Sequence, residues 1–240
     1  MNKIITYENL KYFAYSNDKI CKKPIKGIAF EFFGLGCQDM FDELKIGKSY
    51  AEKGILFLVP YNNPWAWMNK QAVEYTDEIL DVLFKEYNLP ENTPIVSAGG
   101  SMGGQSALVY CKYAKRTPVA CVVSCPVCDL PYHYTERNDL PRTLYSSFFN
   151  YDCNLDEAMK SASPYHLASS LPKINYHIIH CELDKSVNIE KHSVRFVNEL
   201  NNLGYNCTFD ICPDRDHCDL TEEYRHKYSD FVTNEILNAK

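Results

Sequence analysis

A serine flanked by glycines follows an apolar segment near the middle of the chain. Residues 95–103 read IVSAGGSMG, and Gly99, Ser101 and Gly103 match the pattern G-x-S-x-G. The apolar residues predict a strand, and the residues after Ser101 predict a helix with one apolar face. A sharp turn between strand and helix strains the serine, so only small flanking residues avoid clashes. We therefore interpret Ser101 as a nucleophile, with a flexible glycine-rich connector as the alternative.

A serine nucleophile needs a base, and the base needs an acid that orients it. Asp184 directly follows the apolar segment 175–183, and His217 comes shortly after the segment 205–213. Both segments predict strands, and catalytic groups in open α/β sheets gather beyond the carboxyl ends of the strands. The chain order serine, acid, histidine matches one of the known orders of such triads. We predict Ser101, Asp184 and His217 to be nucleophile, acid and base.

Other residues could take the roles of acid and base. Glu182 and Asp129 are alternative acids, and Asp184 could be an ordinary loop carboxylate. Among the seven histidines, only His217 lies in the loop directly after the last predicted strand, which favours it as the base. The predicted strand 175–183 contains His177 and His180, and helical segments contain His192 and His226. The long segment 129–172 contains His133 and His166.

Two backbone N–H groups are needed to stabilise the oxyanion that forms when a serine attacks a carbonyl. The first donor is expected from Met102, the residue after the nucleophile, at the N-terminus of the predicted helix. The second is expected from the stretch FFGLGCQD, in which Gly34 and Gly36 let the backbone approach a substrate. We predict the N–H of Leu35 as this donor, with Gly36 as the alternative.

Six short apolar segments recur along the chain and alternate with helical patterns. Continuous apolar runs of this length are typical of strands covered on both faces, as in a parallel sheet. Strands that alternate with helices imply right-handed crossovers and an α/β domain. We predict a single domain over residues 1–240, with a mostly parallel central sheet and helices on both faces. The strand segments are 26–34, 54–62, 93–100, 118–126, 175–183 and 205–213, and helical stripes lie in 71–87, 189–203 and 224–232.

One segment breaks this alternation. Residues 129–172 contain several prolines and many aromatic residues but no clear strand. A long insertion between core strands is often a functional lid. We predict a short helical lid or cap over 129–172, with a surface excursion that has no role in binding as the alternative.

Charge and hydropathy exclude several classes of protein. The chain has 25 basic and 31 acidic residues and a net charge of −6, which argues against a nucleic-acid partner. No segment approaches the ~20 apolar residues that span a bilayer, and the N-terminus lacks the apolar core of a signal peptide. We therefore expect a cytoplasmic protein without a membrane partner; the sequence does not predict its oligomeric state.

The cysteines do not predict a disulfide framework, because the chain has eleven of them, scattered and odd in number. Cys121, Cys125 and Cys128, with His133 nearby, resemble half of a zinc site, but a second pair at similar spacing is missing. The glycine-rich stretches also lack the residues of nucleotide-binding loops. We therefore expect neither a metal nor another cofactor.

Taken together, these residues resemble the α/β-hydrolase superfamily and, more narrowly, the catalytic domain of the prolyl oligopeptidase-like serine hydrolases. The resemblance begins near residue 24 and rests on GGSMGG, SCPVCDL, SPYHLASSLPKINYHIIHCELDKSV and DRDHCDL. It implies the α/β-hydrolase fold, and it favours Asp184 over Glu182 because the stretch like IIHCELD ends on the triad aspartate. The chain departs from the family at Phe33, where the family has the histidine of a His-Gly pair, and at Cys181, where it has glycine.

Aromatic residues are candidates for contact with a substrate. Trp65 and Trp67 lie in the loop YNNPWAWMN, which in this fold can reach the rim of the active site, and Phe148 of the insertion could face them. Such rings suit an acyl chain, an aromatic acid or a sugar. The alternative is that they pack the insertion onto the core.

The resemblance leaves three classes of function open. A chain of 240 residues holds the hydrolase without the propeller domain of the peptidases, which favours a carboxylesterase that cleaves small or carbohydrate-linked esters through an acyl-enzyme on Ser101. A prolyl oligopeptidase-type peptidase acting on short peptides is the second; it would need an acidic subsite, for which Glu136 or Asp139 is available. A catalytically inactive binding protein on the same fold is the third.

Overall fold

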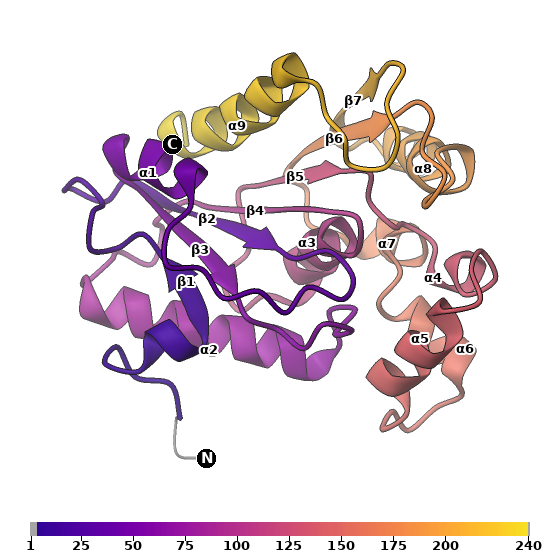
Figure 1. The fold of residues 1–240 in the computed structure, drawn as a ribbon, viewed down its shortest axis with the longest axis horizontal. Coiled ribbons are helices and arrows are strands. Elements are labelled where there is room, and N and C mark those ends of the chain that lie inside the picture. Colours follow the sequence, from indigo (N-terminus) through magenta and orange to yellow (C-terminus); the bar gives the residue numbers. More distant parts are fainter. Residues whose placement is uncertain (1–3, 240) are drawn as a thin grey trace.

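The strands form one sheet of seven within the part of the chain that the structure describes. A computed structural model describes residues 4–239, drawn as a ribbon in Figure 1. The strand order is β1-β3-β2-β4-β5-β6-β7, and every neighbouring pair is parallel except β1 with β3. All six predicted strands and the mostly parallel sheet are confirmed. The strands are β1 (Ala14–Ser16), β2 (Gly27–Phe32), β3 (Ile55–Pro60), β4 (Ile95–Gly100), β5 (Ala120–Ser124), β6 (Asn175–Cys181) and β7 (Asn206–Cys212).

Helices cover both faces of the sheet, as predicted. α1 (Lys45–Glu52) and α9 (Glu222–Leu237) lie on one face, and α2 (Lys70–Glu86), α3 (Met102–Tyr113) and α8 (Arg195–Asn202) lie on the other (Figure 1). Short helical turns are η1 (Leu10–Tyr12), η2 (Ala168–Ser170) and η3 (Glu190–Val194). None of the helices found in residues 4–239 is both long and apolar enough to cross a membrane.

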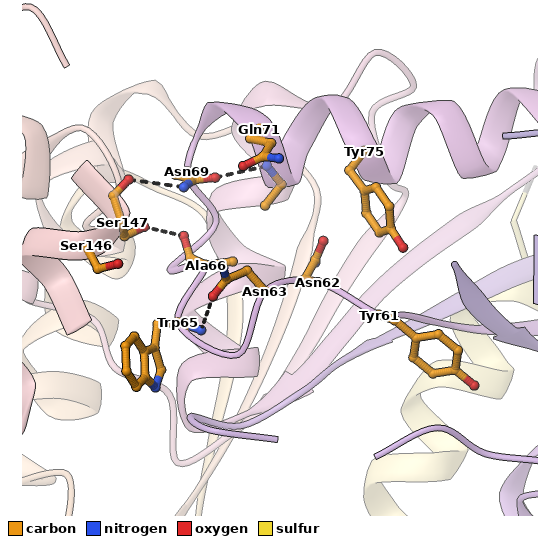
Figure 2. Close-up of a pocket in the computed structure, with 11 residues that line it drawn as sticks. Tyr61, Asn62, Asn63, Trp65, Ala66, Asn69, Gln71, Tyr75, Ser146 and Ser147 are labelled. Carbon is orange, nitrogen blue, oxygen red and sulfur yellow. Dashed lines mark hydrogen bonds between the residues drawn. The ribbon is translucent and has the colours of Figure 1, made fainter. Parts of the chain in front are cut away.

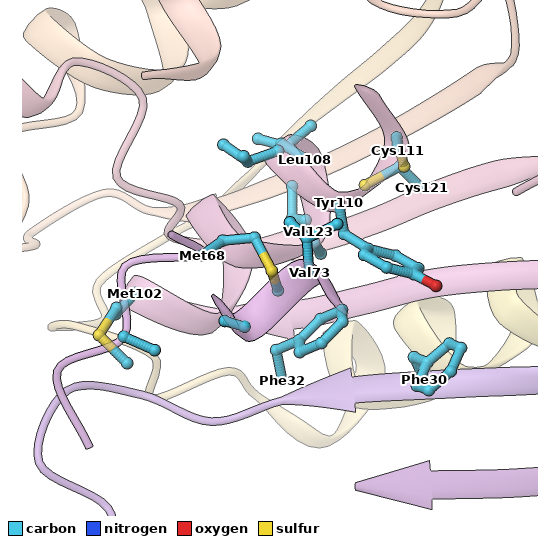
Figure 3. Packing of buried hydrophobic residues seen from close by; sticks show 14 of the residues in the cluster. Phe30, Phe32, Met68, Val73, Met102, Leu108, Tyr110, Cys111, Cys121 and Val123 are labelled. Atoms are coloured by element: carbon cyan, nitrogen blue, oxygen red, sulfur yellow. The ribbon is translucent and has the colours of Figure 1, made fainter. Parts of the chain in front are cut away.

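Neighbouring residues of β2 point to opposite faces of the sheet. Phe30 and Phe32 belong to the core under α2 and α3, whereas Ala29 belongs to the core under α1 and α9. The Phe30 and Phe32 rings stack with centroids 5.7 Å apart, and both contact Tyr110 of α3 (Figure 3). Burying each such side chain stabilises the fold by about 1.5–3 kcal/mol. This packing holds α3 against β2 and thereby fixes the turn on which Ser101 lies.

Helix α2 carries the predicted apolar stripe. Its N-cap, Asn69, accepts the N–H of Ala72 at 3.0 Å, which satisfies one of the free donors of the first turn. The position of this cap sets where the preceding loop 61–69 meets the core. The buried residues of α2 are those of the predicted stripe: Ala72, Val73, Thr76, Ile79, Leu80, Leu83 and Phe84.

Three local features differ from the sequence-based expectation or go beyond it. Strand β1 is only three residues long, too short for an apolar pattern to reveal, and helix α1 was also not predicted. The helical stripe that begins near Ile189 starts as a π-helical turn, and the regular helix α8 begins at Arg195. Gly204 after α8 has a φ of +70°, the left-handed conformation in which glycine commonly ends a helix.

The insertion 129–172 lies beyond the carboxyl ends of the strands and is helical, as predicted (Figure 1). Hydrogen bonds fasten it to the loop before α2: the Trp67 indole N–H donates to Thr143 Oγ1 at 3.1 Å, and Ser147 Oγ donates to the Ala66 carbonyl at 2.6 Å. The buried Gln105 amide of α3 donates to the carbonyl of Trp67 at 3.1 Å and to the carbonyl of Ala162 in the insertion at 2.7 Å. These bonds tie the insertion to α3. Its helices are α4 (Leu130–His133), α5 (Leu140–Phe148), α6 (Leu155–Lys160) and α7 (Pro164–Leu167).

Candidate active site

Ser101 lies on the turn between β4 and α3 in a backbone conformation that is rare for an L-residue. Its φ is 57° and its ψ is −125°, and its N–H donates to the Ser124 carbonyl at 3.0 Å. A Cβ atom on Gly99 would overlap the carbonyl group of Gly103, and one on Gly103 would overlap the carbonyl of Phe32. The glycines on either side of Ser101 are therefore required by the close approach of β2, β4 and α3, as the sequence predicts.

This close approach makes Gly103 a sensitive position for stability. We expect Gly103→Ala to lower the free energy of unfolding by about 3 kcal/mol or more, because the new methyl group would strike the backbone of Phe32 and not a flexible side chain. Urea denaturation measures the change. Gly34→Ala is the matched control, since its Cβ would meet no atom within 4 Å. Equal stability of the two variants would contradict the steric role of Gly103.

The three residues predicted as nucleophile, acid and base lie together in the structure. His217 Nε2 is 2.8 Å from Ser101 Oγ, and His217 Nδ1 is 2.6 Å from Asp184 Oδ2. Asp184 follows β6, His217 follows β7, and these two strands are neighbours in the sheet. With Nδ1–H donated to the carboxylate, the Nε2 lone pair faces the serine hydroxyl, which is the arrangement that a general base requires.

The carboxylate of Asp184 is buried and fully hydrogen-bonded. Its Oδ1 accepts the N–H groups of Ser186 and Val187, each at 2.8 Å, and its Oδ2 accepts His217 Nδ1–H. Burial acts to raise the pKa of Asp184, but hydrogen bonds from His180 and His217 outweigh burial and hold this pKa well below its usual range. An ionised Asp184 can stabilise the imidazolium that forms when His217 takes a proton.

His180 was predicted to be a core residue, and the structure adds a second role. It is fully buried, its Nδ1 accepts from Ser193 Oγ at 2.7 Å, and its Nε2–H lies 3.1 Å from the Val187 carbonyl and 3.2 Å from Asp184 Oδ2. His180 thus helps to position the acid. The spacing of four residues between His180 and Asp184 could have suggested the contact, but a strand residue gives no sign of where the following loop folds back.

The alternative acids lie elsewhere. Glu182 Oε2 accepts the N–H of Asp214 at 3.1 Å, and Asp129 forms an ion pair of 2.7 Å with Arg195. Both carboxylates are thus engaged away from His217, so the geometry favours Asp184. Of the remaining histidines, His177 contacts Glu235, His166 contacts Ser163, and His226 lies exposed near Glu222.

Glu136 is bound by two buried histidines. Its Oε2 is 2.5 Å from His133 Nδ1 and 2.8 Å from His192 Nε2. Burial acts to raise the pKa of Glu136, but the bonds from the two histidines lower it to about 2. Asp139 forms an ion pair with Arg137 at 2.6 Å. Neither of the two carboxylates suggested for a peptide amine is therefore left without a partner.

The two residues predicted as oxyanion donors lie at the start of α3 and in the loop after β2. Met102 is the first residue of α3, where an N–H group has no acceptor within the helix. The Gly36 N–H already donates to the Pro64 carbonyl at 2.9 Å, which weakens this residue as the alternative donor. In the described part of the chain, the Leu35 N–H has no hydrogen-bond acceptor, and it stays our proposal for the second donor.

The cysteines do not form the half-site suggested by their spacing. All eleven are unpaired, and no group of three metal ligands within residues 4–239 includes Cys121 or Cys128. Three other groups bring ligand atoms within 4.8 Å of one another. They are Cys125 with His217 and Cys218, Cys125 with His180 and Asp184, and His133 with Glu136 and His192.

The hydrogen bonds of the histidines separate these three groups. His192 Nδ1 accepts backbone N–H groups, and His180 Nε2 faces two acceptors, the Val187 carbonyl and the Asp184 carboxylate, so in each ring Nε2 carries the proton and has no lone pair for a metal. His217 differs, because its Nδ1 carries the proton that Asp184 accepts. His133 Nδ1 faces the Glu136 carboxylate and carries a proton there, so in the two groups without His217 each imidazole nitrogen that faces the shared carboxylate is protonated. In the group around His217, by contrast, the unprotonated Nε2 lies 3.8 Å from Cys218 Sγ.

Two of the three predicted substrate contacts are wrong. Trp67 is 0% exposed and Phe148 is 2% exposed, so neither has surface to offer a ligand. Both belong to the hydrophobic core: Trp67 donates to Thr143 of the insertion, and Phe148 of the insertion is buried in the same core cluster as Trp67. Trp65 is half-buried and lines a pocket, so it stays a candidate.

That pocket has a volume of about 240 Å³ and lies between the loop 61–69, the start of α2 and helix α5 (Figure 2). A smaller hollow shares Asn62, Asn63 and Ala66 with it and extends to Phe33 and Met102. The pocket is thus continued by a hollow that reaches Met102, one of the two predicted oxyanion donors. None of its lining residues is charged: Tyr61, Asn62, Asn63, Trp65, Ala66, Asn69, Gln71, Ala72, Tyr75, Ser146 and Ser147.

A mostly parallel sheet with helices on both faces, and a serine on the strand-to-helix turn after β4, define the α/β-hydrolase fold. The sequence model of the prolyl oligopeptidase family matches residues 65–234. The chain belongs to this family and is a serine hydrolase of the peptidase and esterase type. A search among curated protein sequences gave no significant match.

Solved structures with the same fold include both peptidases and esterases. Dipeptidyl peptidase 4 of Porphyromonas gingivalis is 16% identical with a TM-score of 0.65, over 88% of this chain and 31% of that one. A truncated carbohydrate esterase from gut microbiota is 18% identical with a TM-score of 0.67, over 90% of this chain and 87% of the esterase. Esterase 2 of Thermogutta terrifontis is 16% identical with a TM-score of 0.65, over 94% of this chain and 88% of that esterase. The chain thus spans about a third of the peptidase and most of either esterase.

Proposed function

We propose that the protein is a carboxylesterase that cleaves small or carbohydrate-linked esters through an acyl-enzyme on Ser101. The observation that carries this proposal is the hydrogen-bonded series from Ser101 through His217 to Asp184, with bonds of 2.8 and 2.6 Å. A neutral polar pocket, which shares Asn62, Asn63 and Ala66 with a hollow that reaches Met102, supports the choice of substrate.

In the proposed mechanism, His217 Nε2 takes the proton of Ser101 Oγ as the oxygen attacks the ester carbonyl. The N–H groups of Met102 and Leu35 stabilise the oxyanion. The C–O bond to the alcohol then breaks, and His217 returns the proton to the leaving oxygen. Water, deprotonated by the same histidine, attacks the acyl-enzyme and releases the acid. Asp184 keeps the imidazole in the required tautomer throughout.

The pocket beside Trp65 suits a neutral, hydroxylated group. In the described structure the amides of Asn62 and Gln71 have no protein partner, and Asn63 uses only its oxygen, which accepts the Trp65 N–H at 3.0 Å. Free amides can donate to and accept from hydroxyl groups, and an aromatic ring can stack on a sugar face. Arg142 lies 5.5 Å from the Trp65 ring but does not line the pocket. We propose that the sugar of a carbohydrate ester binds here.

A peptidase is the second candidate, because the family and the similar dipeptidyl peptidase 4 include peptidases. Recognition of a peptide amine needs an unpaired acidic group near the nucleophile. Glu136 is held by two histidines and Asp139 by Arg137, which counts against these two residues in that role. The esterase is therefore our first choice.

A panel of substrates separates the two candidates. We expect turnover of p-nitrophenyl acetate and of acetylated methyl glycosides, and at least about 100-fold lower kcat/KM on aminoacyl p-nitroanilides. In Asn62→Ala we expect kcat/KM on the acetylated glycoside to fall about 10-fold through a lost hydrogen bond, while p-nitrophenyl acetate is unaffected. Asn202→Ala, an exposed change in α8, is the control. Faster turnover of the anilides would favour the peptidase, and equal losses on both esters would contradict the sugar site.

The state of the cysteines supports a cytoplasmic location. All eleven are unpaired, and seven of them are buried within the fold. Unpaired thiols in this number are typical of a reducing compartment. We therefore propose that the protein works in the cytoplasm.

A further inference from the structure

Two cysteines lie directly beside the proposed general base. Cys218 Sγ is 3.8 Å from His217 Nε2, and the ligand atoms of Cys125, His217 and Cys218 all lie within 4.8 Å of one another. The proposed ester hydrolysis uses neither thiol. From this geometry we propose that Cys125, Cys218 and His217 form a site for Zn²⁺ that reversibly inhibits the enzyme.

The distances suit a tetrahedral zinc ion. Zn–S bonds of about 2.3 Å and Zn–N bonds of about 2.0–2.1 Å place neighbouring ligand atoms about 3.6 Å apart. The separation of 3.8 Å between Cys218 Sγ and His217 Nε2 is close to this value. Two thiolates and one imidazole are a known ligand set for zinc with an open fourth position, which a water molecule can fill.

The surroundings of the three ligands match those of zinc sites. The carboxylate of Asp184 accepts Nδ1–H of His217, which leaves the Nε2 lone pair for the metal, as in carboxylate–histidine–zinc arrangements. Cys125 Sγ accepts the N–H groups of Cys181 at 3.3 Å and Cys218 at 3.4 Å. Such bonds stabilise the negative charge of a metal-bound thiolate.

The backbone also holds both thiols in place. Cys125 has a φ of 44° and Cys218 a φ of 56°, conformations that L-residues rarely adopt. Strained residues cluster at functional sites because the surrounding structure must hold them. Cys125 is buried beneath the site, whereas Cys218 is exposed, so an ion can enter from solvent.

Binding would block the proposed reaction at its first step. Zn²⁺ displaces the thiol protons of Cys125 and Cys218, which go to solvent, and it occupies the lone pair of His217 Nε2. The histidine can then no longer take the proton of Ser101. Removal of the ion by a chelator returns the thiols to their protonated form and frees the base. This inference rests on the proposed role of His217, but zinc binding can be measured separately from activity.

The test uses the full chain under anaerobic conditions, which keep the thiols reduced. Equilibrium dialysis is expected to show one tightly bound Zn²⁺ in the wild type, and Co²⁺ in its place is expected to give thiolate-to-cobalt absorption. In Cys218→Ser we expect the affinity for Zn²⁺ to fall by at least about 10-fold. The zinc concentration for half-inhibition is expected to rise by a similar factor, with each rate compared with the zinc-free rate of the same variant. Cys153→Ser, an exposed cysteine in the insertion, is the control and is expected to behave as the wild type.

Two results would overturn the proposal. If Cys218→Ser is as sensitive to Zn²⁺ as the wild type, Cys218 is not a ligand and the proposed site is wrong. If Co²⁺ gives no thiolate absorption, the cysteines are not ligands. Binding and thiolate absorption in a protein that hydrolyses no ester would instead support the metal site and contradict the proposed function, so the two failures are distinguishable.

Discussion

Replacing Ser101 by alanine is expected to lower kcat for ester hydrolysis by a factor on the order of 10⁴–10⁶. The reason is that the Ser101 oxygen, 2.8 Å from His217 Nε2, is the only protein atom that bonds to the acyl group in the proposed mechanism. Alanine removes this oxygen and leaves the base, the acid and the turn in place. The rate of p-nitrophenyl acetate hydrolysis measures the loss, and urea denaturation checks that the variant is folded.

The control for this change is Ser97→Ala. Ser97 is buried in β4, the strand that leads to Ser101, and its hydroxyl donates to the Ala107 carbonyl at 3.0 Å. We expect Ser97→Ala to keep its activity and to lose about 1 kcal/mol of stability through the lost hydrogen bond. A fluorophosphonate should label the wild type but not Ser101→Ala. Substantial hydrolysis by Ser101→Ala would contradict the assignment of the nucleophile, and a folded wild type without labelling would favour an inactive binding protein.

The positions of the three proposed catalytic residues could be predicted because they depend on topology. Parallel strands bring their carboxyl ends to one edge of the sheet, so residues 83 and 116 positions after Ser101 could be placed beside it from the apolar segments alone. The glycines at 99 and 103 followed from the sharpness of the turn. In each case a local pattern and one rule of sheet geometry were sufficient.

The substrate contacts could not be predicted in the same way, because they depend on how the insertion packs. Trp67 and Phe148 are large aromatic residues in segments near the active site, and only the docking of α5 on the loop 61–69 shows that both are buried. Similarly, the Gly36 N–H is available or occupied depending on where Pro64 lies. Burial and hydrogen-bond partners across loops are tertiary properties that a single sequence does not reveal.

Asp184→Asn is expected to lower kcat by about 10⁴-fold, although the change replaces one oxygen by a nitrogen. Asp184 Oδ1 accepts the N–H groups of Ser186 and Val187, each at 2.8 Å. In the variant the amide oxygen must keep this position, which places the NH₂ group where Oδ2 faces His217. The amide then donates to His217 Nδ1, the ring proton moves to Nε2, and the lone pair that faces Ser101 is lost.

The control for this prediction is Asp219→Asn, an exposed carboxylate that pairs with Arg215 at 3.2 Å and is expected to leave the rate unchanged. Because the backbone bonds to Oδ1 persist in Asp184→Asn, its fold should be retained, which urea denaturation can verify. The loss should appear in kcat more than in KM, since the carboxylate does not contact the substrate in the proposed mechanism. A rate within 10-fold of the wild type would contradict the tautomer argument and would return Glu182 and Asp129 to consideration as the acid.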